Sequence, residues 1–218
     1  VEEVHHHRRS DDRVVEQMGR AAEQDANLVV FPECFVSLYP SGSWAASAAT
    51  WSAACDDLWE RMWASSVDVG GPRVGRLVGA CADLGVHLAI GVNEREDHRP
   101  GSLYNTLLVI GPHGVVHRHR KLMPTLHERV FWGMGPGDDL MVHESEHGRL
   151  GGLICWENFM PEARRHLHRE GVDFYVAPTA DDRDIWVAGM RAFAFEAGAF
   201  VLSPVQYLPK TAFPDDFP

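Results

Sequence analysis

The sequence predicts an α/β protein with a mixed β-sheet flanked by helices. Short apolar runs alternate with amphipathic stretches along the 218 residues, which is typical of strands connected through helices. The turn GPHG at 111–114 joins two strand-like runs, so part of the sheet should be antiparallel. No repeat and no long linker interrupts this pattern, and we therefore expect a single domain over residues 1–218.

The expected elements follow one another in chain order. Apolar positions recur at helical spacing over 12–25, and the run LVVFPE at 28–33 predicts a buried strand stopped by proline. Segment 41–66 is rich in Ala, Ser and Trp without a clean period, and we interpret it as a loop and a short helix on the substrate side. The remaining elements are a helix at 73–84, strands at 86–94, 103–112, 115–121 and 150–155, a helix at 161–170, a strand at 172–178, a helix at 184–197 and a strand at 199–205.

Composition excludes several classes of function. A formal net charge of −11 argues against a nucleic-acid partner, because phosphate binding needs an excess of Lys and Arg. No run approaches the ~20 apolar residues of a membrane span, and the polar start lacks the apolar core of a secretion signal. We therefore expect a cytoplasmic protein without a membrane partner. The four cysteines form no CxxC pair, which favours free thiols in a reducing compartment.

Cys155 is the first candidate for a nucleophile. The apolar run LGGLIC at 150–155 leads directly from a strand into a cysteine and then a helix start. There the helix dipole should favour thiolate over thiol, and the free N–H groups of the first turn could hold a developing anion. The alternative is that Cys155 is a small buried residue of the core.

Two charged residues end other predicted strands. Glu33 ends LVVFPE and Lys121 ends VVHRHRK. Reactive groups gather at the carboxyl ends of strands in open α/β sheets, so these residues could supply a base and a cation beside Cys155. Acyl transfer through a thioester needs that set of groups. Each charged residue taken alone could equally be a solvated surface group.

Three segments resemble a known family. They are FPE at 31–33, HRKLMPTLHERVFWG at 119–133 and CWEN at 155–158. In this order they resemble the signature segments of the nitrilase family within the carbon–nitrogen hydrolase superfamily. The likeness runs from about residue 12 to the end and includes VAPT at 176–179 and MRAFAFEAGAFVLSPVQ at 190–206. It implies a nitrilase-like α-β-β-α sandwich whose helices pack against a second subunit, and hence a homo-oligomer.

The resemblance also implies residue roles and a reaction. Its catalytic residues match Glu33, Lys121, Glu128 and Cys155, while Trp156, Tyr39 and Trp132 match positions that stabilise the developing anion or line the pocket. The reaction is hydrolysis of a nitrile by water to a carboxylic acid and ammonia through a thioimidate and a thioester on the cysteine. It requires no cofactor and no metal.

Glu33 follows an apolar run and should therefore have a raised pKa, which suits a general base. Glu128 should orient Lys121 or the ligand. Its alternative role is a structural ion pair with Arg129 or Arg120.

Three other functions remain open at this point. An amidase of the same superfamily would use the same residues, although CWEN favours nitriles. An inactive fragment could act only through interaction. The motif HESEH, with His143, Glu144 and His147, matches a zinc peptidase pattern that needs both histidines on one helix face. Glycines and a proline around it favour a hairpin edge instead.

Smaller expectations complete the interpretation. We expect His117 and His119 to be solvated on a polar-faced strand, and Cys34 to pack in the core because strand neighbours point to opposite faces. Full-length relatives begin with an apolar strand and continue beyond the end of this chain. The domain should therefore be incomplete at its N-terminal strand and at its C-terminal strands and tail.

Overall fold

The computed structural model describes residues 2–37, 39, 50, 52–96 and 98–207. The loop expected within 41–66 lies largely outside the described residues. The short helix expected after it is confirmed as α3, Ala53–Ser65, which begins at the N-cap Ser52. No helix in the described part of the chain is both long and apolar enough to cross a membrane.

In the described part of the chain, eight strands form two four-stranded sheets rather than one. The first sheet has the order β1-β2-β3-β4 and the second the order β5-β6-β7-β8. Each sheet is mixed, because β1–β2, β6–β7 and β7–β8 are parallel and the other neighbours are antiparallel. The strands are β1 Leu28–Val30, β2 His87–Arg95, β3 Leu103–Gly111, β4 Gly114–Arg120, β5 His143–Ser145, β6 Gly148–Gly152, β7 Phe174–Val176 and β8 Phe200–Leu202.

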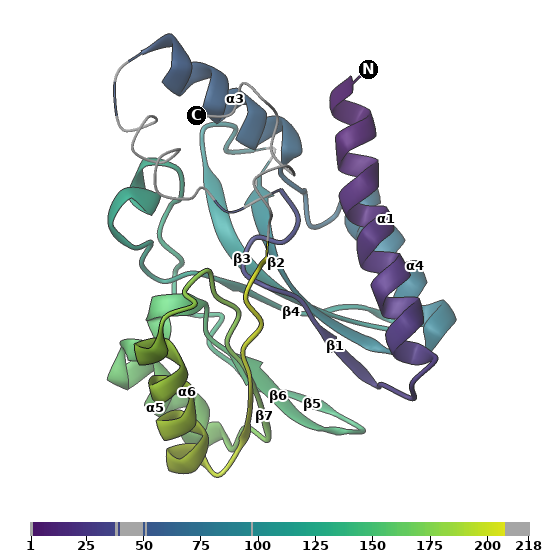
Figure 1. The fold of residues 1–218 in the computed structure, drawn as a ribbon, viewed down its shortest axis with the longest axis vertical. Coiled ribbons are helices and arrows are strands. Elements are labelled where there is room, and N and C mark those ends of the chain that lie inside the picture. The colour runs from purple at the N-terminus through teal and green to yellow at the C-terminus, as the bar shows by residue number, and fades with distance from the viewer. Residues whose placement is uncertain (1, 38, 40–49, 51, 97, 208–218) are drawn as a thin grey trace.

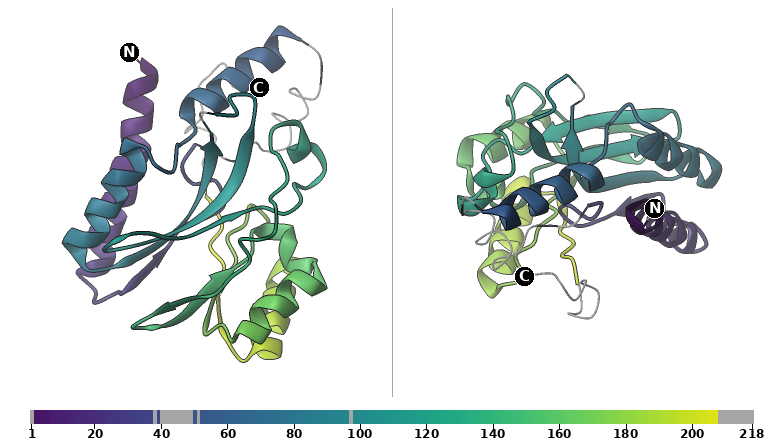
Figure 2. Two further views of the ribbon diagram at one scale, coloured as in Figure 1. Left: turned by 180° about the vertical axis from the view of Figure 1, so that it is seen from behind. Right: turned by 90° about the horizontal axis from the view of Figure 1, so that it is seen from above.

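The helices cover the outer faces of both sheets, as Figures 1 and 2 show. On the first sheet lie α1, Glu2–Ala22, and α4, Pro72–Leu84; on the second lie α5, Pro161–Glu170, and α6, Asp184–Ala197. Apolar clusters fill the spaces between each helical layer and its sheet, and another cluster fills the space between the sheets. The predicted α-β-β-α sandwich is confirmed.

Helix α4 shows how the sequence builds one layer. Its buried side chains, Val74, Leu77, Ala80 and Cys81, recur at helical spacing on one face. Gly85 ends the helix with a left-handed φ of 67°, a conformation that glycine adopts without steric cost. The buried face meets the first sheet, in which all nine residues of β3 are buried.

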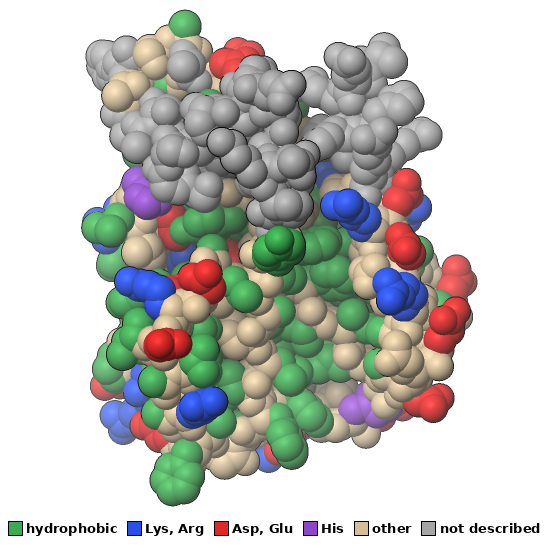
Figure 3. All heavy atoms as spheres, viewed as in Figure 1, with side chains coloured by type: hydrophobic (Ala, Val, Ile, Leu, Met, Phe, Trp, Pro, Cys, Tyr) green, Lys and Arg blue, Asp and Glu red, His purple; other side chains and the backbone are tan. Residues whose placement is uncertain are grey.

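The three strands that carry the candidate residues end on the same side of the molecule. β1 ends three residues before Glu33, β4 ends directly before Lys121, and β6 ends three residues before Cys155. β1 and β8 lie at sheet edges, and Figure 3 shows apolar side chains on the face between the two helical layers. The site itself is built where the strand ends meet.

Candidate active site

A buried ammonium group lies between two carboxylates at these strand ends. Lys121 Nζ donates to Glu33 Oε1 at 2.9 Å and to Glu128 Oε2 at 2.7 Å. Each of the three residues is at most 1% exposed. Burial by itself would lower the pKa of Lys121, but the charges of Glu33 and Glu128 outweigh it and raise that pKa. The lysine therefore stays charged at neutral pH.

Both oxygens of Glu33 are held in place. Asn105 Nδ2 donates to Oε1 at 2.8 Å, and the Ala180 N–H donates to Oε2 at 3.0 Å. The backbone of Glu33 passes close to Gly91 in β2, where a Cβ would lie 2.7 Å from Glu33 Cα. Burial raises the pKa of Glu33, and Lys121 acts in the opposite direction. The raised pKa expected from the apolar surroundings is thus present.

Cys155 begins a single turn of 3-10 helix, η2, Cys155–Phe159, rather than the α-helix that the sequence suggested. The α-helix α5 starts only at Pro161. Cys155 has a left-handed φ of 50°, which is strained for a residue with a Cβ and is often found at functional sites. Its N–H donates to the Pro178 carbonyl at 2.9 Å, which fixes this turn against the end of β7.

The expectation of a dipole-stabilised thiolate is wrong for the resting site. Cys155 is 3% exposed, and burial, followed by the charge of Glu33, raises its pKa to about 12. Lys121 and a hydrogen bond from Thr179 act in the opposite direction without reversing the shift. Desolvation therefore outweighs the few N–H dipoles of a one-turn helix. The thiol remains protonated until a base removes its proton.

Glu128 lies in a second one-turn helix, η1, Leu126–Val130. Besides Lys121, its carboxylate accepts from the Thr125 N–H at 2.6 Å and from the Tyr39 hydroxyl at 2.5 Å. Its alternative partners are engaged elsewhere. Arg120 pairs with Glu94 and Glu96, and Arg129 donates to the Pro124 carbonyl at 3.0 Å. The ion pair of Glu128 is thus made with Lys121 inside the site.

A cavity of about 620 Å³ reaches Glu128 and Cys155, while Glu33 and Lys121 are not among the residues that line it. It is lined by Tyr39, Thr125, Leu126, His127, Glu128, Cys155, Trp156, Ala180, Asp181, Asp182 and Arg183. Tyr39 and Trp156 therefore form part of the cavity wall. Trp132 is not among the lining residues: it is 3% exposed, packs with its ring centroid 5.8 Å from that of Tyr39, and donates through Nε1 to Asn93.

The indole of Trp156 makes its own hydrogen bond at the mouth of the cavity. Its Nε1 donates to Asp181 Oδ2 at 3.1 Å, and the Arg183 guanidinium lies 5.5 Å from the ring centroid. Any stabilisation of an anion by this residue therefore falls to its backbone N–H, which belongs to the first turn of η2. The side chain forms part of the cavity wall.

The expectation that His117 and His119 are solvated is wrong. His117 is 5% exposed and His119 is fully buried. His119 Nδ1 lies 2.8 Å from Asp139 Oδ1, and Nε2 lies 3.1 Å from Glu157 Oε2. Burial would lower the pKa of His119, but Glu157 and Asp139 raise it to about 9. A charged imidazolium thus connects β4, two residues before Lys121, to the turn that contains Cys155.

Three contributors to the site were missed by the sequence analysis: Asn105, Thr179 and the pair His119–Glu157. Asn105 lies in a strand-like run, and Thr179 lies in the VAPT segment. The site residues that they contact are distant in sequence, so no local pattern marks either one. Glu157 was visible inside CWEN, and its spacing of two residues from Cys155 was the available signal.

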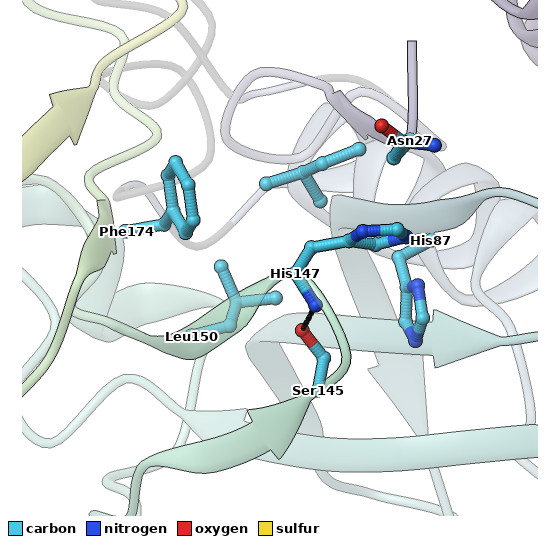
Figure 4. Close-up of a pocket in the computed structure, with 7 residues that line it drawn as sticks. Asn27, His87, Ser145, His147, Leu150 and Phe174 are labelled. Carbon is cyan, nitrogen blue, oxygen red and sulfur yellow. Dashed lines mark hydrogen bonds between the residues drawn. The ribbon is translucent and has the colours of Figure 1, made fainter.

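A second, smaller cavity lies at the opposite strand ends (Figure 4). It has a volume of about 190 Å³ and is lined by Asn27, Leu28, His87, Ser145, His147, Leu150 and Phe174. The zinc-like motif falls here, on the hairpin of β5 and β6 rather than on a helix. Among the described residues, no group of three or more His, Cys, Asp or Glu side chains is placed to hold a metal ion. The predicted hairpin is confirmed, and it does not provide the helix face that the peptidase motif needs.

A four-layer sandwich in which a buried ammonium joins two carboxylates beside a cavity lined by a cysteine is the arrangement expected of a carbon–nitrogen hydrolase. The chain belongs to that family, since the family model Carbon-nitrogen hydrolase matches residues 11–209.

The comparisons give two kinds of likeness. The chain is 42% identical over 200 residues to a nitrilase from Bradyrhizobium diazoefficiens, covering 91% of this chain and 61% of that protein. It is 40% identical to a bifunctional nitrilase/nitrile hydratase from Nicotiana tabacum, covering 93% and 58%. The chain therefore spans about 60% of the length of these relatives.

Solved structures support the fold alone. Nit3 of Saccharomyces cerevisiae, a member of the nitrilase superfamily, aligns with a TM-score of 0.71 at 21% identity, covering 93% of this chain and 72% of that one. An amidase from a Nesterenkonia species aligns with a TM-score of 0.65 at 22% identity, covering 91% and 70%.

Proposed function

We propose that this site hydrolyses a nitrile to a carboxylic acid and ammonia through a covalent bond to Cys155. The single observation that carries the proposal is the buried set of Glu33, Lys121 and Glu128, joined by hydrogen bonds of 2.9 and 2.7 Å, beside a cavity that Glu128 and the buried Cys155 line. The names of the relatives at about 40% identity support nitriles as the substrate class.

The first half of the reaction needs a base, because the thiol is protonated at rest. Glu33 takes the Sγ proton as the sulfur attacks the nitrile carbon, and one C–N π bond breaks as the C–S bond forms. The negative charge that grows on nitrogen is stabilised by the Lys121 ammonium and by backbone N–H groups of η2. The protonated Glu33 then passes its proton to that nitrogen, which gives a neutral thioimidate.

The second half consumes two water molecules. Glu33 removes a proton from the first water as its oxygen attacks the thioimidate carbon, and the C–N bond breaks with release of ammonia, leaving an acyl thioester. A second water attacks the thioester in the same way, the C–S bond breaks, and the acid leaves while the thiol regains its proton. The hydrogen bonds from Asn105 and Ala180 keep Glu33 aimed through both steps.

An amidase would use the same residues and enter this sequence at the tetrahedral adduct. A further outcome is release of an amide, because two tobacco relatives and two lupin relatives are named bifunctional nitrilase/nitrile hydratase. The product depends on which bond of the tetrahedral adduct breaks after the first water has added. Cleavage of the C–N bond releases ammonia, and cleavage of the C–S bond releases the amide. Parallel assays of one nitrile and its amide, with acid, amide and ammonia all quantified, separate the three activities.

The test is a nitrile panel spanning aliphatic, aromatic and arylacetonitrile substrates, with ammonia and acid measured for the wild type and for Cys155→Ala. We expect turnover that Cys155→Ala abolishes and that the matched control Cys55→Ala retains, since Cys55 lies on α3 and does not line the cavity. Intact mass spectrometry during turnover should show an acyl adduct on Cys155. A chain that forms neither product nor adduct with any nitrile or amide would instead support an interaction-only role.

A further inference from the structure

The side chain of Thr179 contacts the sulfur of Cys155. It is 1% exposed, and its Oγ1 lies 3.1 Å from Cys155 Sγ. The segment after β7 carries it: Thr179 forms a parallel bridge with Val205, and its N–H donates to the Pro204 carbonyl at 3.2 Å. The segment that follows β7 thus positions the hydroxyl, and the same segment holds the η2 turn through the bond from the Cys155 N–H to the Pro178 carbonyl.

The other contact of the hydroxyl determines its direction. The Asp181 N–H donates to Thr179 Oγ1 at 2.9 Å, so one lone pair of this oxygen is occupied. A hydroxyl has one hydrogen and two acceptor lone pairs. Beside a neutral thiol, either atom can donate; beside a thiolate, only the hydroxyl can. The contact at 3.1 Å therefore becomes a charge-assisted hydrogen bond when the proton leaves sulfur.

The next residue links this contact to the base. The Ala180 N–H donates to Glu33 Oε2 at 3.0 Å and also acts on the thiol, where its hydrogen bond and that of Thr179 both favour the ionised sulfur. Two consecutive residues thus contact the proton donor and the proton acceptor of the proposed first step.

We propose that Thr179 is a catalytic residue whose hydroxyl donates a hydrogen bond to the Cys155 thiolate. The inference rests on the proposed role of Cys155 as nucleophile. The thiolate exists twice in the cycle, once as it forms for attack and once as the thioester C–S bond breaks, and the hydroxyl stabilises it both times. No proton leaves Thr179: Glu33 accepts the thiol proton in the first case, and in the second it gives the sulfur the proton that it has taken from the second water.

The test compares four variants by the rate at which iodoacetamide alkylates Cys155 between pH 7 and 10, with the modified cysteine located by peptide mapping. Thr179→Val keeps the shape of the side chain and removes the hydroxyl; Thr179→Ala removes it without the risk of a misplaced methyl. Thr179→Ser restores the hydroxyl. Thr106→Val serves as the matched control. It removes another buried hydroxyl, which donates to Glu94 within the first sheet.

We expect alkylation of Thr179→Val and Thr179→Ala to be about tenfold slower at each pH, since a charge-assisted hydrogen bond contributes at least one pKa unit. Thr179→Ser should lie within about threefold of the wild type, and Thr106→Val should match it. Wild-type rates in both hydroxyl-free variants, with folding verified by circular dichroism, would overturn the proposal. The alkylation rate can be measured without turnover of any substrate. It therefore tests the role of Thr179 separately from the nitrilase proposal, which would fail if Cys155→Ala retained turnover.

Discussion

At the residue scale, the carboxylate of Glu128 connects three other residues of the site. Its two oxygens accept hydrogen bonds from Lys121, Thr125 and Tyr39, so it orients the ammonium without lying between base and thiol. Removing its charge should misplace Lys121 and leave the protein folded, because the amide of glutamine can still accept from the Thr125 N–H.

We expect Glu128→Gln to lower kcat/KM about 100-fold, the effect typical of a displaced catalytic group. Tyr39→Phe removes only one neutral donor from the same carboxylate and should cost about fivefold. Steady-state kinetics on the best nitrile measures both. Equal losses in the two variants would contradict the view that the ion pair with Lys121 is the important contact.

The strand-end argument proposed Glu33, Lys121 and Cys155 as one site, and the family resemblance added Glu128. The thiolate expected at Cys155 rested on a dipole argument that the sequence can supply, whereas the burial that raises its pKa comes from distant chain segments. Lys121 and Glu33 are 88 residues apart, so the hydrogen bond between them could not be read from a local pattern. Thr179 has no local signal, because its partner lies 24 residues away.

At the element scale, His119 connects a strand of the first sheet to the η2 turn, which follows a strand of the second sheet. It lies on β4 of the first sheet, contacts Glu157 in η2 and Asp139 in the preceding loop, and has a pKa raised to about 9. Glu157 in turn accepts from the Ile154 N–H at 2.6 Å. The histidine therefore connects the segment that carries Lys121 to the one that carries Cys155.

This contact should make stability depend on pH. Because the folded-state pKa of His119 lies above the ordinary value of 6.5, its contribution is fully present below about pH 6.5 and is lost as pH rises through 9. The shift corresponds to roughly 3 kcal/mol. Urea unfolding of the wild type minus His119→Gln, measured from pH 6 to 10, should show this decline. His98→Gln, with a 76% exposed side chain, is the control; a pH-independent difference for His119→Gln would refute the assignment.

The loop after β1 depends on a close approach by β2. A Cβ at Gly91 would lie 2.5 Å from Cys34 N and 2.6 Å from Pro32 O, both backbone atoms that cannot move without moving Glu33. We expect Gly91→Ala to destabilise the fold by about 1–3 kcal/mol and to reduce activity beyond the loss of folded protein. Gly75→Ala in α4, where nothing lies within 4 Å, should stabilise by about 0.5–1 kcal/mol. Thermal unfolding and specific activity of both variants check this; unchanged specific activity of folded Gly91→Ala would count against it.

Three helices with strong periodicity were predicted with their boundaries, whereas the boundaries of other elements were not. The helices expected at 73–84, 161–170 and 184–197 match α4, α5 and α6 within one residue. Helix α1 begins at Glu2 instead of 12, since helix propensity continues through polar residues that lack an apolar stripe. The strands expected at 28–33 and 199–205 shorten to three residues each, because apolar composition does not determine where pairing stops.

At the scale of the whole molecule, helix α6 carries apolar residues on its outer surface. Ile185, Val187 and Phe195 are 60%, 43% and 92% exposed, and large exposed apolar side chains commonly mark contact surfaces. This agrees with the expectation from the resemblance that the helices pack against a second subunit. We propose that the outer face of α6 contacts a second copy of the chain.

Phe195→Glu should therefore shift the chain toward monomer in sedimentation equilibrium while leaving thermal unfolding of the monomer unchanged, because the native ring contacts mainly solvent. Glu162→Gln, on the neighbouring helix α5 with an 86% exposed side chain, provides a control for a change in surface charge. A wild-type chain that is monomeric at all concentrations, or a variant that associates equally well, would contradict this interface.

The enclosed ammonium of Lys121 has a practical consequence. The sequence contains only one other lysine, Lys210, and its arginines do not acylate under mild conditions. Lys121 is 1% exposed and held between two carboxylates, so it offers no free amine lone pair to a reagent. Covalent attachment to a solid support through N-hydroxysuccinimide chemistry should thus spare Lys121, and digestion after coupling should recover the Lys121 peptide unmodified.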